Sequence, residues 1–422
     1  MSIVYGGTLS RFLNNSKVII RKIVNFALPQ LLNNVFALVA VMVFTRHYGG
    51  HAFLGYGLGY SYGFIISSVA SWGWGLVGAA TVAPASDKRR FEYLWCFYKS
   101  TAVLVLSLLP FFAIALWLTC SPDERGIAFL SFFATVVATF VPKWWFFAAD
   151  LPNFLMYYLV IPKALANLIS ALWIQFGNGP AISFPGLLLL FIFGGFLLFT
   201  IKYKIWTYRS DLKPIEVLKH QFPAFINSVG YTLNNKVLLP IVTVISTTAA
   251  VAFNLGNQLY AYWTIPATIM VSAFQNHVNR EGKKSLESSL KFTTIWFASF
   301  GFALGLLLWL LGPWVSKIAF GGTYGNISLS YLIIGLTFLC YSLNSAFVAL
   351  YLAPLGFTNI TSKITILSLL TGLLTIYPLV KLFGTNGAYL AFCITETVIT
   401  VGAIIVIYQH KKRGLESGSV SI

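Results

Sequence analysis

Charged side chains inside long apolar segments are the residues of this sequence with the clearest chemistry. Lys163 lies in the apolar stretch 153–175 and Lys236 in 221–246. Counted at 1.5 Å per residue, Lys163 would be roughly 16 Å from the start of its stretch, and Lys236 would be past the middle of its own. A charge in hydrocarbon costs several kcal/mol, so such residues usually face a cavity or a partner. We interpret both lysines as anion-binding groups; the alternative is that each reaches an interface or pairs with an acid.

Arg46 is a third basic residue of interest, because it follows the apolar stretch 23–45 directly. Lys143 and Arg125 lie close to the ends of apolar stretches instead. A long basic side chain at such a position extends readily to the interface. We therefore interpret Lys143 and Arg125 as interfacial.

Two acidic residues could couple transport to an ion gradient. Glu396 lies near the middle of the apolar stretch 387–408, where a carboxyl group could take up a proton or help to bind sodium. A structural ion pair or hydrogen bond explains it equally well. Asp150 follows Lys143 by seven residues, which places the two on one face of a continuing helix. An interfacial charge is the more typical interpretation of Asp150.

Amide and aromatic side chains are candidates for the lining of a polar cavity. Asn33, Asn34 and Asn227 occupy equivalent places in two apolar stretches. They could bind a substrate, or they could hydrogen-bond between helices. Tyr56 and two further aromatics, Tyr60 and Phe64, recur every four residues. Sugar rings could stack on such a stripe, but packing and interfacial belts account for most aromatics in membrane proteins.

Several other chemistries are excluded by what the sequence lacks. It has no G-x-x-x-x-G-K-[ST] motif for nucleotide binding and no Ser-His-Asp, paired-carboxylate or metal-ligand constellation. Its four cysteines are scattered, with no C-x-x-C pair. We expect a protein that is not an enzyme, holds no cofactor and binds no nucleic acid.

Composition places this chain in the membrane. Apolar residues make up 58% of its 422 residues and charged residues 9%, against about 25% charged in soluble proteins. Lysine and arginine outnumber aspartate and glutamate by 28 to 11, a net charge of +17. In a membrane protein such an excess is expected in cytoplasmic loops.

The apolar stretches predict an all-α polytopic protein with about 12 spans of the ~20 residues that a bilayer needs. We expect these spans at 23–45, 53–83, 93–118, 126–148, 153–175, 183–203, 221–246, 251–276, 292–315, 328–354, 361–381 and 387–408. They divide the chain into a basic leader (1–22), a six-helix bundle (23–203), a basic linker (204–220), a second six-helix bundle (221–409) and a tail (410–422).

Two echoes suggest that the second bundle repeats the first. The segment 29–35 (PQLLNNV) is echoed 194 residues later at 223–229 (PAFINSV), and Leu54-Gly55 is echoed 201 residues later at Leu255-Gly256. Basic residues at 87–90, 202–219, 280–284 and 411–413 all fall on one side if the span count holds. We therefore expect both termini in the cytoplasm and two parallel repeats around a central cavity.

The pattern resembles the polysaccharide flippases of the MOP exporter superfamily, in particular the Wzx-type O-unit flippases. The likeness covers about 23–409 and includes Arg46-His47-Tyr48-Gly49-Gly50, Trp144-Trp145-Phe146-Phe147, and residues 384–388 (GTNGA) leading to Thr395-Glu396. Relatives commonly have Gln-Gly and a charged residue where this chain has Ala148-Ala149-Asp150. The resemblance implies a MATE-like fold.

This resemblance also implies a substrate and a location. Such proteins move an undecaprenyl-pyrophosphate-linked oligosaccharide across the bacterial inner membrane, with a polysaccharide polymerase and a chain-length regulator as further partners. Lys163, Lys236 and Arg46 would form the cationic path for the pyrophosphate, and membrane lipid would surround the protein. Two alternatives stay open: a cation-coupled multidrug exporter of the same superfamily, and a membrane polymerase or ligase. The exporter would favour carboxylates in its site, and the enzyme would have a large outer loop.

Overall fold

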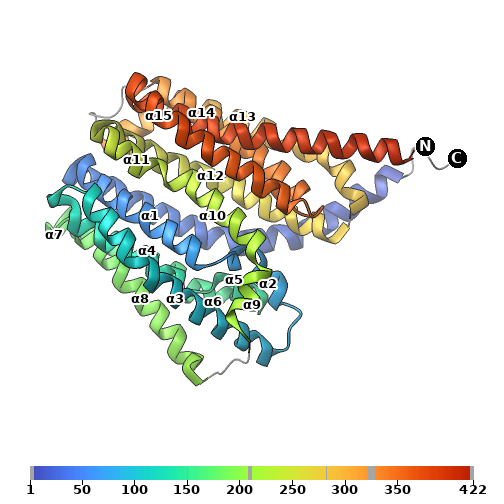
Figure 1. Ribbon diagram of the computed structural model, residues 1–422, viewed down its shortest axis with the longest axis horizontal. Helices are drawn as coiled ribbons and strands as arrows, with labels where there is room; N and C mark the ends of the chain where they lie inside the picture. The colour runs from blue at the N-terminus through green and yellow to red at the C-terminus, as the bar shows by residue number, and fades with distance from the viewer. Residues whose placement is uncertain (1–3, 150, 208–211, 282, 322–327, 419–422) are drawn as a thin grey trace.

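The computed structural model describes residues 4–149, 151–207, 212–281, 283–321 and 328–418. All regular secondary structure within these ranges is helical. Figure 1 shows most of the helices running along the length of one elongated bundle. A helix pairs its own backbone N–H and C=O groups, which hydrocarbon requires of any segment that crosses it.

The N-terminal half is built from helices that alternate with short turns. They are α1 (Val4–Ala70), α2 (Trp74–Val82), α3 (Asp87–Thr119), α4 (Arg125–Thr139), α5 (Lys143–Ala148), α6 (Pro152–Leu155), α7 (Ile161–Gly177) and α8 (Ser183–Lys202). A 3₁₀ turn (Pro122–Glu124) precedes α4, and a π-helical segment (Met156–Val160) joins α6 to α7.

The C-terminal half follows a connection that contains a 3₁₀ turn (Ile205–Thr207) and the short helix α9 (Pro214–His220). Its helices are α10 (Phe222–Lys236), α11 (Leu238–Ile245), α12 (Thr247–Glu281), α13 (Lys283–Phe320), α14 (Ser328–Asn344) and α15 (Thr358–Gly418). A π-helical segment (Ser345–Leu352) extends α14.

Two of these helices are in fact helical hairpins. In α1 the helix is interrupted at Gly49, with φ +79° and ψ 175°, and in α15 at Gly384, with φ +56° and ψ −127°. Both φ values lie where glycine is strongly preferred. The arms of α15 run antiparallel, because Gly372 packs against Thr395 and Gly402 against Ile364. Each hairpin therefore supplies two of the expected spans.

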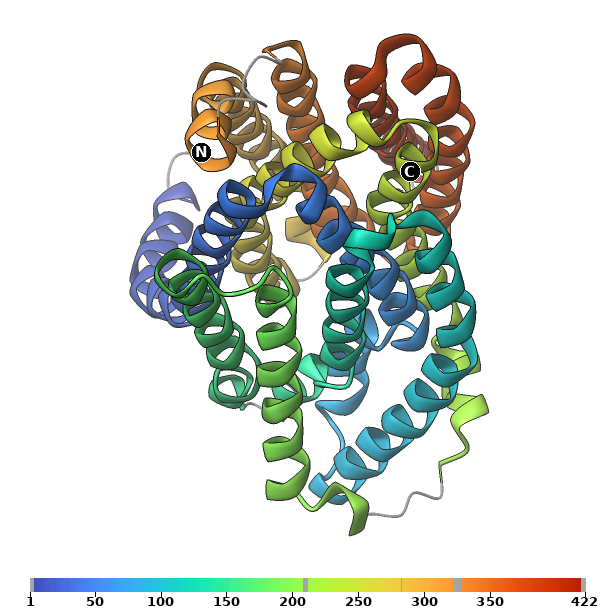
Figure 2. The ribbon, with the colours of Figure 1, turned by 90° about the vertical axis from the view of Figure 1, so that its left-hand side faces the viewer.

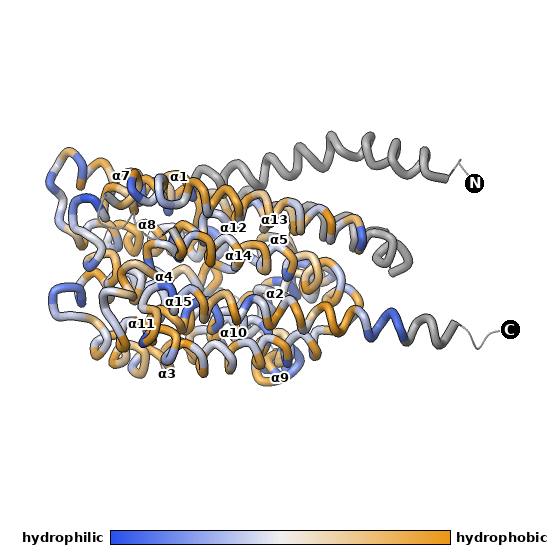
Figure 3. Tube along the Cα trace, turned by 90° about the horizontal axis from the view of Figure 1, so that it is seen from above, coloured by the Kyte–Doolittle hydropathy of each residue, from blue (hydrophilic) through white to orange (hydrophobic). Residues whose placement is uncertain are grey.

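The prediction of an all-α polytopic membrane protein is confirmed. Seven helices in the described part of the chain are long and apolar enough to cross a membrane, and one of them, Thr358–Lys412, holds both arms of a hairpin. Figure 3 shows hydrophobic residues along the helices and many of the hydrophilic ones near their ends.

In the structure α1 begins at Val4 and is first interrupted at Gly49, so one helix covers both the described part of the expected leader and the expected span 23–45. The expected span 53–83 is broken, because Ser71, Trp72 and Gly73 separate α1 from α2. Trp72 adopts φ +43° and Gly73 φ +79° at this break. The ring of Trp72 stacks at 3.9 Å on Phe225 of the other half, so a contact between the halves accompanies the break.

The two halves lie side by side along the bundle. Figures 1 and 2 show α3 to α8 on one side and α12 to α15 on the other, and α1 contacts both α10 and α12. The start of α1 and the end of α15 lie at one end of the bundle, which we call the terminal end. The hairpin turns at Gly49 and Gly384 lie at the opposite end.

Candidate functional site

A cavity of about 790 Å³ lies between the two halves. Helices α1 to α5, α7 and α8 line it from the N-terminal half, and α10 and α12 from the C-terminal half. The lining extends from Phe184 and Asn254 near the opposite end to Ala79 and Lys143 near the terminal end. Since both halves form its wall, a movement of one half against the other would reshape it.

Three lysines line this cavity, and we call them the cavity lysines: Lys143 of α5, Lys163 of α7 and Lys236 of α10. They lie at different heights. Counted along the chain at 1.5 Å per residue, Lys236 is about 14 Å from Ile245 at the end of α11, Lys163 about 21 Å from Gly177 at the end of α7, and Lys143 about 27 Å from Arg125 at the start of α4. The cavity lysines therefore follow one another from the terminal end toward the middle of the bundle.

No carboxylate balances the cavity lysines within the described part of the lining. Its described side chains include no aspartate or glutamate. The ion pairs found in the described ranges join His51 to Glu124 and link charged residues within α3 and next to α9, none of which lines the cavity. A cavity with charges of one sign and low-dielectric walls concentrates ions of the opposite sign. This cavity is therefore suited to an anion.

Lys236 is held against the aromatic stripe of α1. Its Nζ lies 5.0 Å from the ring centre of Tyr60 and 5.7 Å from that of Phe64, both within the range of cation–π attraction. Tyr56 continues the stripe and also packs at 4.8 Å on Phe184. The stripe was interpreted as helix packing; in the structure it packs and also lines the cavity.

Hydroxyl and amide groups make up most of the remaining polar lining. Many of the hydroxyls bond to carbonyls one helical turn away, as Thr135 does to Ser131 at 2.9 Å, which keeps their oxygens in fixed places. The hydroxyl residues are Ser61, Ser67, Ser68, Ser71, Ser131, Thr135, Thr139, Ser228, Thr232, Thr264 and Thr268, and the amide residues are Asn33, Asn34, Asn167, Asn254, Asn257 and Gln258.

The predicted asparagines separate into two groups. Asn33 and Asn34 line the cavity, and Oδ1 of Asn33 is buried without a hydrogen-bond partner among the described residues. Asn227 is not among the lining residues; its neighbour Ser228 takes that place. The residue of α10 that lines the cavity is therefore one position away from the asparagine that the sequence repeat indicated.

The other predicted site residues lie elsewhere. Arg46 is not in the described lining, and its guanidinium donates a hydrogen bond to the carbonyl of Ile318 in α13. The cationic path as predicted, with Arg46 beside Lys163 and Lys236, is thus not assembled in this structure. Lys143, interpreted as interfacial, is the third lysine of the cavity instead. Asp150 lies outside the described residues.

Glu396 lies in the core of the C-terminal half and not in the described cavity lining. It is 1% exposed. Nδ2 of Asn344 donates a hydrogen bond of 2.6 Å to its Oε2, while its Oε1 has no hydrogen-bond partner in the described part of the chain. The hydroxyl of Thr400 donates to Oδ1 of Asn344 at 2.7 Å, which fixes the orientation of that amide. A buried carboxyl in this setting has one oxygen free for a proton or a cation.

A hydrogen bond joins the two halves beside the cavity. Nδ2 of Asn254 in α12 donates a hydrogen bond of 3.0 Å to the carbonyl of Phe53 in α1. Gly57 permits the close approach, since a Cβ there would lie 2.3 Å from Oδ1 of Asn254.

Comparisons with known proteins bear on the fold. No family model and no curated protein matches the sequence. A multidrug resistance MATE family transporter of the MOP superfamily, in an inward-facing conformation, matches with TM-score 0.71 at 12% identity over 92% of this chain and 96% of its own. The lipid II flippase MurJ in an inward closed conformation matches with TM-score 0.56 at 15% identity over 91% and 87%. The chain shares its fold with these two proteins.

A further solved structure shares this fold. A MATE family transporter in an outward-facing conformation matches with TM-score 0.59 at 15% identity, over 94% of this chain and 95% of its own. Multidrug transporters and a lipid flippase share the fold, so the fold alone leaves the cargo open.

Proposed function

We propose that this protein is a flippase that moves an undecaprenyl-pyrophosphate-linked oligosaccharide across the bacterial inner membrane by alternating access. The observation that carries the proposal is the cavity between the halves, with three lysines and no acidic side chain in its described lining. A pyrophosphate is a compact anion, and lysine binds phosphate as a point charge. The cavity lysines at successive heights would hold the pyrophosphate as it crosses.

The rest of the lining suits a sugar. Sugars present hydroxyl groups at their edges and apolar C–H faces, which hydrogen-bond to amides and hydroxyls and pack on aromatic rings. The cavity supplies fixed hydroxyls, five asparagines and Gln258, together with the Tyr56, Tyr60 and Phe64 stripe. The MurJ match supports a lipid-linked cargo on this fold.

The basic loops support an orientation for the protein. We place the terminal end in the cytoplasm, because Lys88, Arg89 and Arg90 lie there with the basic connection between the halves and the basic tail. In this orientation the Asn254–Phe53 contact lies toward the periplasm. A polysaccharide polymerase and a chain-length regulator remain proposed partners on the opposite side.

We further propose that Glu396 couples transport to a proton or sodium gradient. Its free Oε1 is buried in the C-terminal half, and Asn344 orients the carboxyl group. Leaving an ionised carboxylate unpaired in such a place is costly, so binding of a proton or a cation there is favoured. This coupling is independent of the identity of the cargo.

A cation-coupled exporter of small molecules is the second candidate, because MATE multidrug transporters match the fold. The two candidates differ in the charge of the cargo. Purified protein in vesicles should transport a fluorescent undecaprenyl-diphosphate sugar across the membrane. It should not transport a cationic dye such as rhodamine 6G. Replacement of Lys163 and Lys236 by glutamine should abolish that movement, while Lys317→Gln on α13, outside the described cavity lining, should not. Transport of the dye and not of the lipid would favour the exporter.

A further inference from the structure

Trp144 and Trp145 are adjacent tryptophans of α5 with different surroundings. The indole N–H of Trp145 donates a hydrogen bond of 3.3 Å to the carbonyl of Arg90, and its ring packs on Phe91 and Phe199. Trp144 lines the cavity instead, and its buried Nε1 has no hydrogen-bond partner in the described part of the chain. Trp145 therefore has a complete set of contacts, whereas Trp144 keeps a hydrogen-bond donor that is unused.

Neighbouring side chains hold the Trp144 ring in place. Trp74 of α2 stacks on it with ring centres 4.5 Å apart, and Phe97 of α3 packs on it in an edge-to-face arrangement at 5.5 Å. Gly78 allows α2 to approach, since a Cβ there would lie 2.9 Å from Cδ2 of Trp144. Nε1 is on the opposite edge of the indole, so it faces away from Gly78. Because the ring is already fixed, its N–H group loses little freedom when a ligand binds.

Two of the cavity lysines accompany this donor at the terminal end of the cavity. Lys143 directly precedes Trp144 in α5, and it lies close enough to Lys163 of α7 for their like charges to repel each other. All three residues line the cavity. An indole N–H and an ammonium group donate hydrogen bonds and accept none. The terminal end of the cavity thus holds three donors that cannot pair with one another.

From these observations we propose that Trp144 donates a hydrogen bond to the pyrophosphate of the substrate, and that Trp144, Lys143 and Lys163 form the subsite where this head group first binds. We call it the entry subsite, since the terminal end is cytoplasmic in the orientation above. A buried donor without an acceptor costs free energy, and the anionic oxygens of a pyrophosphate supply acceptors. The indole adds a fixed direction to the point charges of the two lysines. The proposal rests on the flippase function above.

Binding of inorganic pyrophosphate to purified protein in nanodiscs, measured by calorimetry, tests the role of the N–H group. Trp144→Phe removes the donor and keeps an aromatic ring, and 3-benzothienylalanine at Trp144 removes it and keeps the shape of the indole. Each change should weaken binding roughly tenfold, as expected for a hydrogen bond to a charged group.

Trp74→Phe is the matched control for this measurement. Nε1 of Trp74 is likewise buried without a partner among the described residues, but Trp74 is not in the described cavity lining. We expect Trp74→Phe to bind pyrophosphate as the parent does. Equal weakening by Trp74→Phe would mean that the ring stack matters and the Trp144 donor does not. Unchanged binding in both Trp144 variants would also overturn the proposal.

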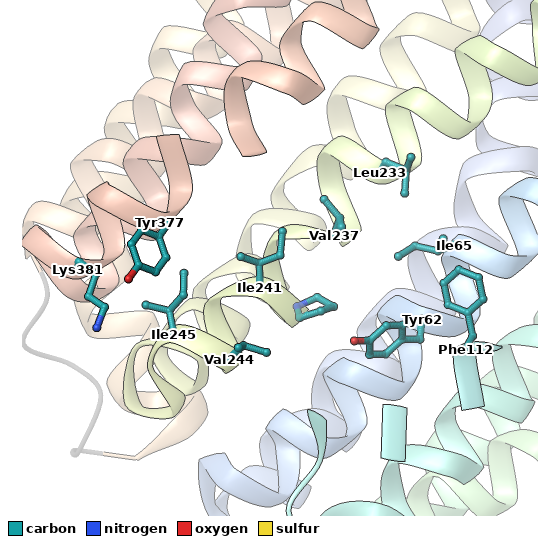
Figure 4. A pocket seen from close by; sticks show the side chains of 11 residues that line it. Tyr62, Ile65, Phe112, Leu233, Val237, Ile241, Val244, Ile245, Tyr377 and Lys381 are labelled. Carbon is teal, nitrogen blue, oxygen red and sulfur yellow. The ribbon is translucent and has the colours of Figure 1, made fainter. Parts of the chain in front are cut away.

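A lysine of a different hollow provides the control for charge. Lys381 lines a separate, mainly apolar hollow of about 760 Å³, where Figure 4 shows it near Tyr377. Lys143→Gln should weaken pyrophosphate binding roughly tenfold. Lys381→Gln removes the same charge outside the described cavity lining, and it should leave binding unchanged. Equal weakening in both variants would mean that the net charge attracts the anion and that there is no entry subsite.

The lipid-linked substrate distinguishes the entry subsite from a site for free pyrophosphate. Binding of undecaprenyl diphosphate should weaken by the same factor in both Trp144 variants, and weakening for inorganic pyrophosphate alone would overturn the proposal. Unchanged binding of undecaprenyl diphosphate in the Trp144 variants, alongside weaker binding in Lys163→Gln, would reject the entry subsite and retain the flippase. Unchanged binding in both Lys163→Gln and Lys236→Gln would reject the flippase itself.

Discussion

The side-chain amide of Asn254 donates a hydrogen bond of 3.0 Å to the carbonyl of Phe53, and the two residues are 201 positions apart. The same offset separates Leu54-Gly55 from Leu255-Gly256. Corresponding points of the two repeats therefore meet, as residues do when they lie close to the axis that relates two halves. We propose that this contact closes the cavity toward the opposite end and breaks when the cavity opens there.

Asn254→Leu should shift the protein toward a conformation that is open at the opposite end. The change removes one hydrogen bond between the halves, worth about 1 kcal/mol, or roughly a fivefold change in the ratio of the two conformations. The measurement is labelling of a cysteine introduced at Gln258, in the cavity lining, by a membrane-impermeant maleimide added from outside the cell. The four natural cysteines are first replaced.

The control for this variant is Asn235→Leu, since the amide of Asn235 bonds only within its own helix, to the carbonyl of Tyr231 at 2.9 Å. We expect its labelling to match that of the parent. Equal labelling in the Asn254 and Asn235 variants would mean that the Asn254–Phe53 contact does not hold the cavity closed.

Gly73→Ala should destabilise the protein at the break between α1 and α2. Gly73 has φ +79°, and a Cβ there would lie 2.7 Å from the backbone nitrogen of Phe225 in the other half. The left-handed backbone alone costs about 1–2 kcal/mol for a residue with a side chain. We expect a lower Tm in detergent, measured by intrinsic fluorescence. Gly75→Ala, whose Cβ meets no atom within 4 Å, should leave Tm nearly unchanged, and equal effects would contradict the packing argument.

Much of the fold could be predicted from the sequence, because hydrocarbon imposes length and apolarity on every spanning helix. The break at Ser71–Gly73 could not. The segment 53–83 is apolar throughout, and its interruption accompanies the stacking of Trp72 on Phe225, a contact between residues far apart in the chain. Hydropathy measures single segments, so it carries no signal for such contacts.

The site was predictable only for residues deep within a span. Lys163 and Lys236 lie well inside the expected spans 153–175 and 221–246, so their depth could be counted, and both line one cavity in the structure. Lys143 was missed, because residues 140–142 separate α4 from α5 and the lysine begins a new helix that lines the cavity. Arg46 lies three residues before the turn at Gly49. Its hydrogen-bond partner is a carbonyl of α13, which no local sequence pattern indicates.

Glu396→Gln should abolish the dependence of transport on an ion gradient. Glutamine keeps the shape of the protonated acid but cannot lose a proton or supply a negative charge to sodium. Transport in vesicles would be measured with and without proton and sodium gradients, at matched amounts of protein. Glu216→Gln on α9 is the control, because Glu216 is exposed. If wild-type transport has the same rate with and without both gradients, Glu396 has no coupling role.

Reporter fusions test the proposed orientation. A reporter that is active only in the periplasm should be silent after Lys213 or Arg413 and active after Asp123 or Gly321, because the first two lie at the terminal end and the last two at the opposite end. An active reporter after Lys213 would invert the assignment and contradict the count of spans in the N-terminal half.

The central claim is that the cavity lysines bind an anionic head group by charge, and binding of undecaprenyl diphosphate to purified protein in nanodiscs tests it most directly. Lys163→Gln and Lys236→Gln should each weaken binding by about 1.5–3 kcal/mol, or roughly tenfold to a hundredfold, as expected for a charge-assisted hydrogen bond. Lys163→Arg and Lys236→Arg should retain most of the affinity, since the charge is kept. Unchanged affinity in both glutamine variants, with the protein folded and at normal abundance, would contradict the account.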